Sequence, residues 1–136
     1  MSSHDLSFLI GSFGASAVLI YGAPTSPLAQ PRNLIGGHFL SAVVGCAWRV
    51  TIDRFEHSVT VALAVSTSIV VMQFTETLHP PGGATALIAV TTQPLLPWAN
   101  FLYMFVPVLT GAIMMLIVAL IVNNLSNHRT YPNWWW

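Results

Sequence analysis

The residues best suited to chemistry gather in one stretch, where Glu76 and His79 lead into the sequence Pro80-Pro81-Gly82-Gly83. Proline has no backbone N–H and glycine accepts backbone angles that other residues avoid, so this run interrupts a preceding helix. Small residues that suit the start of a new helix follow, among them Thr85. A helix start offers unpaired backbone N–H groups and the positive end of the helix dipole. The stretch therefore predicts a binding site for a small anion.

Each residue of this stretch has a predicted part in such a site. Gly82 and Gly83 would let an anion approach the backbone, and Thr85 would add a hydroxyl donor. His79 can donate a hydrogen bond either as an imidazolium or through one nitrogen of a neutral ring. The alternative is a structural role, in which Pro80 and Pro81 only cap and redirect the chain while His79 bonds to a carbonyl or a lipid headgroup.

Glu76 precedes His79 by three residues, so the two side chains could share one helix face and bind a metal or relay a proton. A single Glu-x-x-His pattern is weak evidence for a metal, because no second carboxylate and histidine set completes a site. We therefore expect no metal and no cofactor. Glu76 is interpreted as an interfacial carboxylate, with proton transfer as the alternative.

The composition places the chain in a membrane. Charged residues make up only 6% of its 136 residues, against about 25% in soluble proteins. The hydrophobic fraction is 54%, the mean hydropathy is +0.69, and residues 77–128 contain no Asp, Glu, Lys or Arg. With zero net charge and no lysine, the chain has no basic patch for nucleic acid.

The hydrophobic pattern predicts an all-α, polytopic transmembrane bundle that occupies residues 1–136 as one domain. A helix needs about 20 apolar residues to cross a bilayer core of about 30 Å. No alternation of polar and apolar residues favours a β-barrel. The segments are expected at about 8–23, 34–50, 58–74, 83–92 and 101–122. Segment 83–92 would rise only about 15 Å as a helix, so it either spans part of the bilayer or re-enters; Pro107 is expected to kink the last segment.

Two short segments resemble each other at an offset that predicts an internal repeat. Residues 14–20 (Gly-Ala-Ser-Ala-Val-Leu-Ile) align with residues 83–89 (Gly-Ala-Thr-Ala-Leu-Ile-Ala). Transporters are often built from repeats that carry short, broken helices at corresponding positions. Gly14 and Ser16 would then supply the second half of the anion site. Chance similarity between small-residue membrane helices is the alternative.

Three further residues are candidates for a transport pathway. Arg32 and Asn33 precede the second segment and could attract an anion at a pathway mouth, although an interfacial Arg that only orients the helix is equally consistent. His38 lies within the second segment, where ionisable groups are costly and usually functional. A histidine bonded to a neighbouring carbonyl is the alternative for His38.

Three ordered stretches resemble the HPP family of integral membrane proteins. They are residues 10–19 (Ile-Gly-Ser-Phe-Gly-Ala-Ser-Ala-Val-Leu), residues 26–38 (Ser-Pro-Leu-Ala-Gln-Pro-Arg-Asn-Leu-Ile-Gly-Gly-His) and residues 79–86 (His-Pro-Pro-Gly-Gly-Ala-Thr-Ala). The resemblance implies a small polytopic transporter, and plant and cyanobacterial relatives are linked to nitrite transport. It also implies a further hydrophobic helix before the first stretch, where this chain has only residues 1–7; the chain is then a short member or lacks that helix.

These observations predict a membrane transporter or channel for a small inorganic anion, held at broken-helix N-termini. Nitrite is the anion that the resemblance implies. We expect no enzymatic activity, contact with the lipid bilayer, a homo-oligomer, and a multi-pass position in a bacterial or cyanobacterial inner (plasma) membrane. The alternative is a non-transporting membrane assembly subunit. A pathway predicts a polar, hydrated cavity around His79 and Gly14, whereas an assembly subunit predicts dry packing there.

Overall fold

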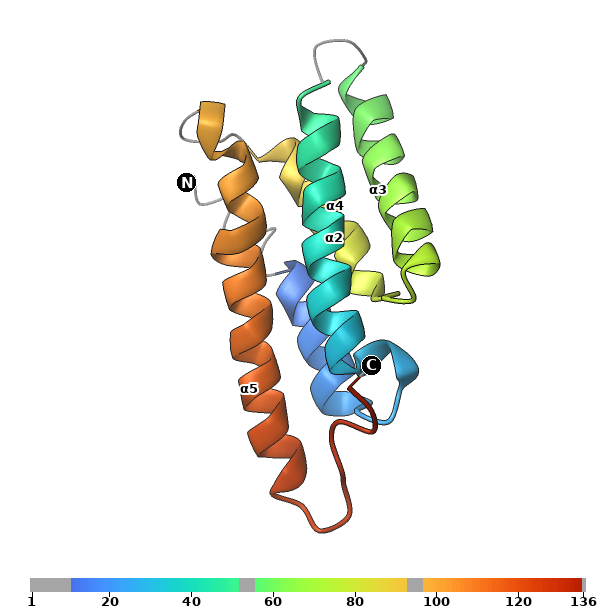
Figure 1. Ribbon diagram of the computed structural model, residues 1–136, viewed down its shortest axis with the longest axis vertical. Coiled ribbons are helices and arrows are strands. Elements are labelled where there is room, and N and C mark those ends of the chain that lie inside the picture. Colours follow the sequence, from blue (N-terminus) through green and yellow to red (C-terminus); the bar gives the residue numbers. More distant parts are fainter. Residues whose placement is uncertain (1–10, 52–55, 93–96, 136) are drawn as a thin grey trace.

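The computed structural model describes residues 11–51, 56–92 and 97–135, and every regular element among them is helical (Figure 1). The elements are the N-terminal helix Gly11–Gly22, whose last turn Val18–Gly22 is a π-helix (η1), the short 3-10 helix η2 (Pro27–Ala29), α2 (Pro31–Arg49), α3 (His57–Phe74), α4 (Pro80–Thr91), the 3-10 helix η4 (Pro97–Met104), the π-turn η5 (Phe105–Leu109) and α5 (Thr110–Asn124). Residues 8–10 of the first predicted segment, like residues 1–7, lie outside the described residues. The predicted all-α class is confirmed.

Two helices begin earlier than predicted, and both begin at a proline. α2 starts at Pro31 instead of residue 34, and α4 starts at Pro80 instead of residue 83. Proline is favoured at the first helical position, because the N–H that it lacks would have no partner there and its backbone angle already suits a helix. The Pro-Pro-Gly-Gly run is therefore the first turn of α4 and not a break that precedes it.

The last predicted segment, 101–122, is interrupted as its proline predicts. Val106 has extended backbone angles (φ −130°, ψ 115°) directly before Pro107, and the regular helix α5 begins only at Thr110. Proline lacks the donor and clashes with the preceding turn, so a helix cannot pass through it undisturbed. The kink expected at Pro107 is confirmed.

α2 is the central helix of the bundle. In Figure 1 it runs through the middle of the view with α3 on one side and α5 on the other, and α4 passes behind it. Three small residues four positions apart, Gly37, Ser41 and Gly45, allow α4 to approach α2 closely. A β-carbon added at Gly45 would lie 2.6 Å from the carbonyl oxygen of Ala86. Small residues at this spacing are typical of helix contacts in membranes.

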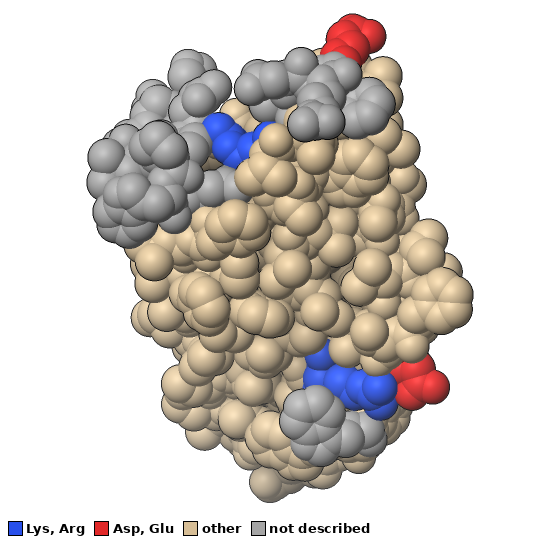
Figure 2. Space-filling model, turned by 45° about the horizontal axis from the view of Figure 1, so that its top comes forward, with Lys and Arg blue, Asp and Glu red and all other residues tan. Residues whose placement is uncertain are grey.

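Charged side chains lie at the two ends of the bundle. On α2, Arg32 and Arg49 are about 26 Å apart at 1.5 Å per residue, close to the thickness of a bilayer core. α3 begins just after Glu56 and ends just before Glu76. Figure 2 shows the consequence on one face: each end carries both blue and red atoms, and a broad uncharged band lies between the two ends.

The outer surface of this band is apolar. Helices His57–Phe74 and Phe101–Asn124 are long and apolar enough to cross a membrane, with mean hydropathies of 1.5 and 2.7. Large apolar side chains lie exposed along α3 and α5, among them Ile69, Val70, Ile113, Met114, Ile117, Val118, Ile121 and Val122. In a soluble protein such a surface would be unfavourable, whereas lipid solvates it. The fold is therefore an all-α membrane bundle.

Candidate functional site

Two histidines meet inside the bundle and share one hydroxyl group. His38 comes from the middle of α2 and His79 is the residue before α4; their ring centroids are 4.9 Å apart. Both side chains are fully buried, with 0% exposed. The Ser16 Oγ of the N-terminal helix lies 2.7 Å from Nε2 of His38 and 2.8 Å from Nε2 of His79. Ser16 therefore bridges the two imidazoles.

The remaining nitrogen of each ring also has a protein partner. His79 Nδ1 lies 2.9 Å from the carbonyl oxygen of Leu28, in the connection before α2. His38 Nδ1 lies 2.7 Å from Oγ1 of Thr85 on α4. Thr85 Oγ1 in turn lies 2.8 Å from Oγ of Ser12, on the N-terminal helix. Together the side chains of Ser12, Ser16, His38, His79 and Thr85 form one connected polar network.

With both rings neutral the network has five hydrogens for six contacts, so one contact lacks a hydrogen. We assign that place to the longest contact, the 3.1 Å between Ser12 Oγ and the Pro81 carbonyl. A carbonyl oxygen can only accept, so His79 Nδ1 carries the hydrogen that it donates to Leu28. In a neutral ring His79 Nε2 must then accept, and Ser16 donates to it. Having used its one hydrogen, Ser16 accepts from His38 Nε2, which leaves His38 Nδ1 to accept from Thr85. The two neutral rings therefore have opposite tautomers.

The network joins the two segments of the predicted repeat. Ser12 Oγ lies 3.1 Å from the carbonyl oxygen of Pro81, at a sequence separation of 69 residues. Ser16 and Thr85 have the same separation, and they bond to the two nitrogens of one ring, His38. Because Ser12 meets Pro81 and Thr85 while Ser16 meets His79, the contacts run in opposite directions along the two helices. The two helices therefore run antiparallel, as corresponding helices of an inverted repeat would, and the repeat itself stays a prediction.

The helix start at α4 does not provide the backbone donors that the sequence analysis predicted. Its first two residues, Pro80 and Pro81, have no N–H, and the N–H of Gly82 donates to the carbonyl of His79 at 2.8 Å. A β-carbon at Gly82 would lie 2.8 Å from Ser41 Oγ on α2, so this glycine permits close helix packing. Gly83 is also buried. The expectation of an anion held by unpaired N–H groups here is therefore wrong.

Gly14 does not join the network either. It is exposed, and a β-carbon added there would have no neighbouring atom within 4 Å. It lies inside the helix Gly11–Gly22, where Ser12 and Ser16 occupy the buried face one turn apart. Of the two residues that the repeat predicted for the second half of the site, the structure brings only Ser16 to it.

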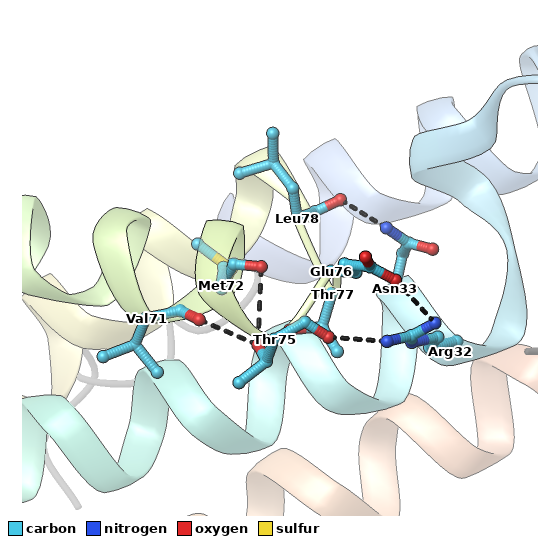
Figure 3. A network of polar contacts seen from close by, with 8 residues as sticks. All are labelled: Arg32, Asn33, Val71, Met72, Thr75, Glu76, Thr77 and Leu78. Carbon is cyan, nitrogen blue, oxygen red and sulfur yellow. Dashed lines mark hydrogen bonds and ion pairs between the residues drawn. The ribbon is translucent and has the colours of Figure 1, made fainter.

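Arg32, Asn33 and Glu76 lie beside the turn that leads to His79 (Figure 3). Arg32 donates to the carbonyl of Thr75 at 2.8 Å and pairs with Glu76 at 3.3 Å, while Asn33 Nδ2 donates to the carbonyl of Leu78 at 2.8 Å. Thr75 is the C-cap residue of α3, and its Oγ1 donates to the backbone carbonyls of Val71 and Met72 in that helix. These bonds hold the turn against the start of α2 and so position His79.

The proposed pairing of Glu76 with His79 on one helix face is wrong. Glu76 lies in a turn with a φ of 54°, and its side chain is 77% exposed. It faces Arg32 at one end of the bundle, whereas His79 points inward. The exposure of Glu76 and its pair with Arg32 are consistent with an interfacial carboxylate, which remains our interpretation of this residue. Among the residues that the structure describes, no three His, Cys, Asp or Glu side chains lie close enough to share a metal ion.

Sequence reasoning missed two members of the network. Ser12 does not stand out among the small residues of its segment, although it lies four positions before Ser16 and therefore on the same helix face. The carbonyl of Leu28 has no signature at all, because every residue type carries a backbone acceptor. The edge of the Phe13 ring packs on His38 with centroids 5.5 Å apart, which further fixes that ring.

The fold and this buried network define an integral membrane helix bundle with a polar centre. The chain belongs to the HPP family: the family model described as HPP, transmembrane region, matches residues 1–132. Two curated transmembrane proteins of Dictyostelium discoideum are similar to it. One is 58% identical over 134 residues, which cover 97% of this chain and 47% of the relative; the other is 56% identical over 131 residues, which cover 95% and 42%. The chain thus spans less than half the length of these relatives, and no solved structure matches it.

Proposed function

We propose that this chain forms a pathway for a small inorganic anion, with nitrite as the first candidate. The observation that carries the proposal is the burial of two imidazoles and three hydroxyls at one point in an otherwise apolar bundle. Ionisable side chains are expensive inside a membrane, and where they occur they usually mark a substrate or proton pathway. Nitrite is chosen as the candidate anion because of the HPP resemblance, since plant and cyanobacterial members are linked to nitrite transport.

The position of Ser16 Oγ indicates where an anion would bind. That atom lies within hydrogen-bond distance of Nε2 in both rings. An anion oxygen in its place could accept from the imidazole Nε2 that carries hydrogen, without any formal cation from Lys or Arg. On this proposal the described arrangement corresponds to a closed state, because His38 and His79 both bond to Ser16. Transport therefore requires the N-terminal helix to move Ser16 away, which favours a gated carrier over an open channel.

A structural role in membrane assembly is the second candidate, and one observation favours it. The network side chains bond directly to each other, as dry packing predicts, and glycines let the backbones touch. A β-carbon at Gly37 would lie 2.5 Å from His79 Cβ. In this reading the network only locks the N-terminal helix to α2 and α4.

The test is nitrite uptake into liposomes that contain the full chain. His79→Gln removes a network histidine but keeps a polar side chain, and His128→Gln changes an exposed histidine beyond α5 as a matched control. We expect saturable uptake by the unchanged chain and by His128→Gln, competition by nitrate or chloride, and loss of uptake in His79→Gln.

The two candidates differ in what would contradict them. Full uptake by His79→Gln, or no uptake by inserted, folded protein, contradicts the anion pathway. If uptake is absent and His79→Gln also lowers the melting temperature in detergent, the structural role is favoured. Because the curated relatives are about twice as long as this chain, nitrite uptake should also be measured with one of them.

The assembly and the cellular membrane are also proposed. The exposed apolar face of α5 could contact lipid or a second copy, and we propose a homo-oligomer, which chemical cross-linking in membranes would test. A multi-pass position in a bacterial or cyanobacterial plasma membrane is proposed too, although the curated relatives come from Dictyostelium discoideum. Fractionation of cells that express a tagged chain checks this.

A further inference from the structure

We propose that Ser12, Thr85, His38, Ser16 and His79 form a proton relay that takes up one proton with each transported anion. The anion part of this inference rests on the proposed function above. The relay itself rests on the geometry of the network, in which four successive contacts between side chains measure 2.7 or 2.8 Å. Proton relays in membrane proteins use chains of this kind.

With both rings neutral, the hydrogen bonds run in a single direction. Ser12 donates to Thr85, Thr85 to His38 Nδ1, His38 Nε2 to Ser16, and Ser16 to His79 Nε2. His79 Nδ1 completes the chain by donating to the carbonyl of Leu28. Each member donates once and accepts once, except at the ends. Such chains polarise one another and can pass a proton by small shifts of each hydrogen.

The network can also accept an added proton without leaving a donor unpaired. A proton bound at His38 Nδ1 would be donated to Thr85 Oγ1. Thr85 would then rotate its hydroxyl toward Ser12, and Ser12 would donate to the carbonyl of Pro81 at 3.1 Å. Ser12 has one hydrogen, which goes to Thr85 in the assigned neutral network and to the Pro81 carbonyl in the protonated one, where all six contacts hold a hydrogen. Only hydroxyl rotations are required.

The added proton can then move between the rings through Ser16. His38 Nε2 passes its hydrogen to Ser16 Oγ while Ser16 passes its own to His79 Nε2. His38 becomes neutral and keeps the hydrogen on Nδ1, and His79 becomes the imidazolium. The proton leaves from His79 when its contact with the half-buried Leu28 opens. One proton enters at His38 Nδ1 and one leaves from His79 Nδ1. Both rings are then in the opposite tautomer, and the rings and hydroxyls must return to their first arrangement before the next proton enters.

An anion at this depth needs a countercharge, because an unpaired ion in an apolar interior is strongly unfavourable. No Arg, Asp or Glu side chain in the described part of the chain is hydrogen-bonded to the network. The titratable and charged groups on the elements packed around it are Tyr21, Arg32, Cys46, Arg49, Glu56, His57, Glu76, Tyr103, Arg129 and Tyr131. The arginines bond to backbone carbonyls at the bundle ends, and Tyr103 reaches only the carbonyl of Thr85, at 3.4 Å.

Protonation supplies both the charge and the donor that an anion requires. In the neutral network His79 Nε2 is an acceptor, so it would repel an anion. Once the proton has passed through Ser16, His79 Nε2 presents an N–H toward the position of Ser16 Oγ, and the imidazolium carries the positive charge. Proton and anion would therefore bind together as a neutral pair, and transport would be electroneutral.

The tautomers provide the first test, and they do not depend on transport. Nitrogen-15 NMR of the full chain in lipid bilayers distinguishes protonated from unprotonated ring nitrogens. We expect hydrogen on Nδ1 of His79 and on Nε2 of His38 at high pH, with the signals assigned by the His79→Gln and His38→Gln variants. On acidification both rings should change with one common midpoint, as one shared proton requires. Equal tautomers, or two independent midpoints, would overturn the relay.

Proton uptake provides the second test, with a pH-sensitive dye inside liposomes that contain the full chain. A nitrite pulse should carry in one proton per nitrite, independently of membrane potential, beyond the leak of nitrous acid in protein-free liposomes. Thr85→Val and Ser16→Ala remove relay hydroxyls and should abolish this uptake. Thr85→Ser keeps the hydroxyl and should retain it, as should Ser66→Ala, which changes an exposed serine that bonds only within α3.

The outcomes separate the relay from the proposed function. Nitrite uptake without proton uptake overturns the relay and leaves the anion pathway standing. Proton uptake that survives in both Thr85→Val and Ser16→Ala also overturns it. If neither nitrite nor protons enter, the proposed function fails, and the NMR tautomers then decide the relay by themselves.

Discussion

At the scale of single residues, the described polar atoms buried in this bundle are almost all paired. Asn123 Oδ1 is the exception among them, while its amide nitrogen donates to the carbonyl of Ile20. Pairing extends to the C-terminal tail, where the hydroxyl of Tyr131 donates to the carbonyl of Ala29 at 2.7 Å. Tyr131 thereby holds the tail against the connection that also contains Leu28, the acceptor at the end of the His79 contact.

Removing the Tyr131 hydroxyl should weaken the fold and change its response to alkali. Tyr131→Phe loses one buried hydrogen bond, which costs about 1 kcal/mol. Burial, and secondarily Tyr21, raises the pKa of Tyr131 from 10.0 to about 12. The unfolded chain therefore loses this proton first, so the stability due to Tyr131 is fully present below pH 10 and declines toward pH 12. Thermal unfolding in detergent between pH 8 and pH 12 measures both effects.

A comparison of the unchanged chain with Tyr131→Phe tests whether the pKa of Tyr131 is raised in the fold. The difference in melting temperature between the unchanged chain and Tyr131→Phe should shrink as the pH rises through this range. A difference that stays constant would show that Tyr131 has no raised pKa in the fold.

At the scale of elements, the position of the site depends on how closely α2 and α4 approach. Gly37, Ser41 and Gly45 lie on one face of α2, and α4 lies against them. A β-carbon at Gly37 would lie 2.8 Å from the carbonyl of Thr77. Because His79 directly precedes α4, this contact sets how far its ring lies from His38.

A methyl group in this contact should separate the helices, whereas one elsewhere should not. Gly45→Ala places a β-carbon 2.6 Å from a backbone oxygen, and such overpacking costs typically about 1–3 kcal/mol. Gly14→Ala is the matched control, because it meets no atom within 4 Å and should stabilise the helix by up to roughly 1 kcal/mol. Melting temperatures in detergent compare the two, and a harmless Gly45→Ala would refute the close contact.

At the scale of the whole molecule, the charged side chains lie at the two ends of the bundle, and the face between them in Figure 2 shows none. The connection before α2 and the segment after α5 belong to the same end. Arg129 donates to the carbonyl of Tyr21, and the Asn133 amide reaches the carbonyl of Thr25 at 3.5 Å. Glu56, before α3, lies at the other end, beyond the length of α2.

Chemical labelling should find these ends on opposite sides of a membrane. In a Cys46→Ala background, single cysteines at Thr25, Asn127 and Glu56 would each be exposed. A membrane-impermeant maleimide should label Thr25→Cys and Asn127→Cys from one side and Glu56→Cys from the other, because α2 separates them by about 26 Å. Labelling of all three from one side would contradict a membrane-crossing α2.

The class of fold was determined by the sequence, because this class depends on the overall charge content and on the length of the apolar runs. The near absence of charge required lipid as the solvent, and apolar runs without alternation required helices. Helix ends were less secure. The predicted segments 34–50 and 83–92 begin after Pro31 and Pro80, although proline is equally suited to a first helical turn.

Most side chains of the site were predicted from the sequence, but their contacts were not. His38, His79, Ser16 and Thr85 could be named in advance, because polar groups are conspicuous in an apolar sequence. Their partners could not, since a contact between residues far apart depends on the rotation of each helix and on the distance set by small residues such as Gly37. The same geometry left Gly14 on the outer surface and turned Glu76 toward Arg32. The sequence thus determined which groups lie in the membrane, and only the tertiary structure decided which of them touch, because helix packing is what brings distant side chains within hydrogen-bond distance.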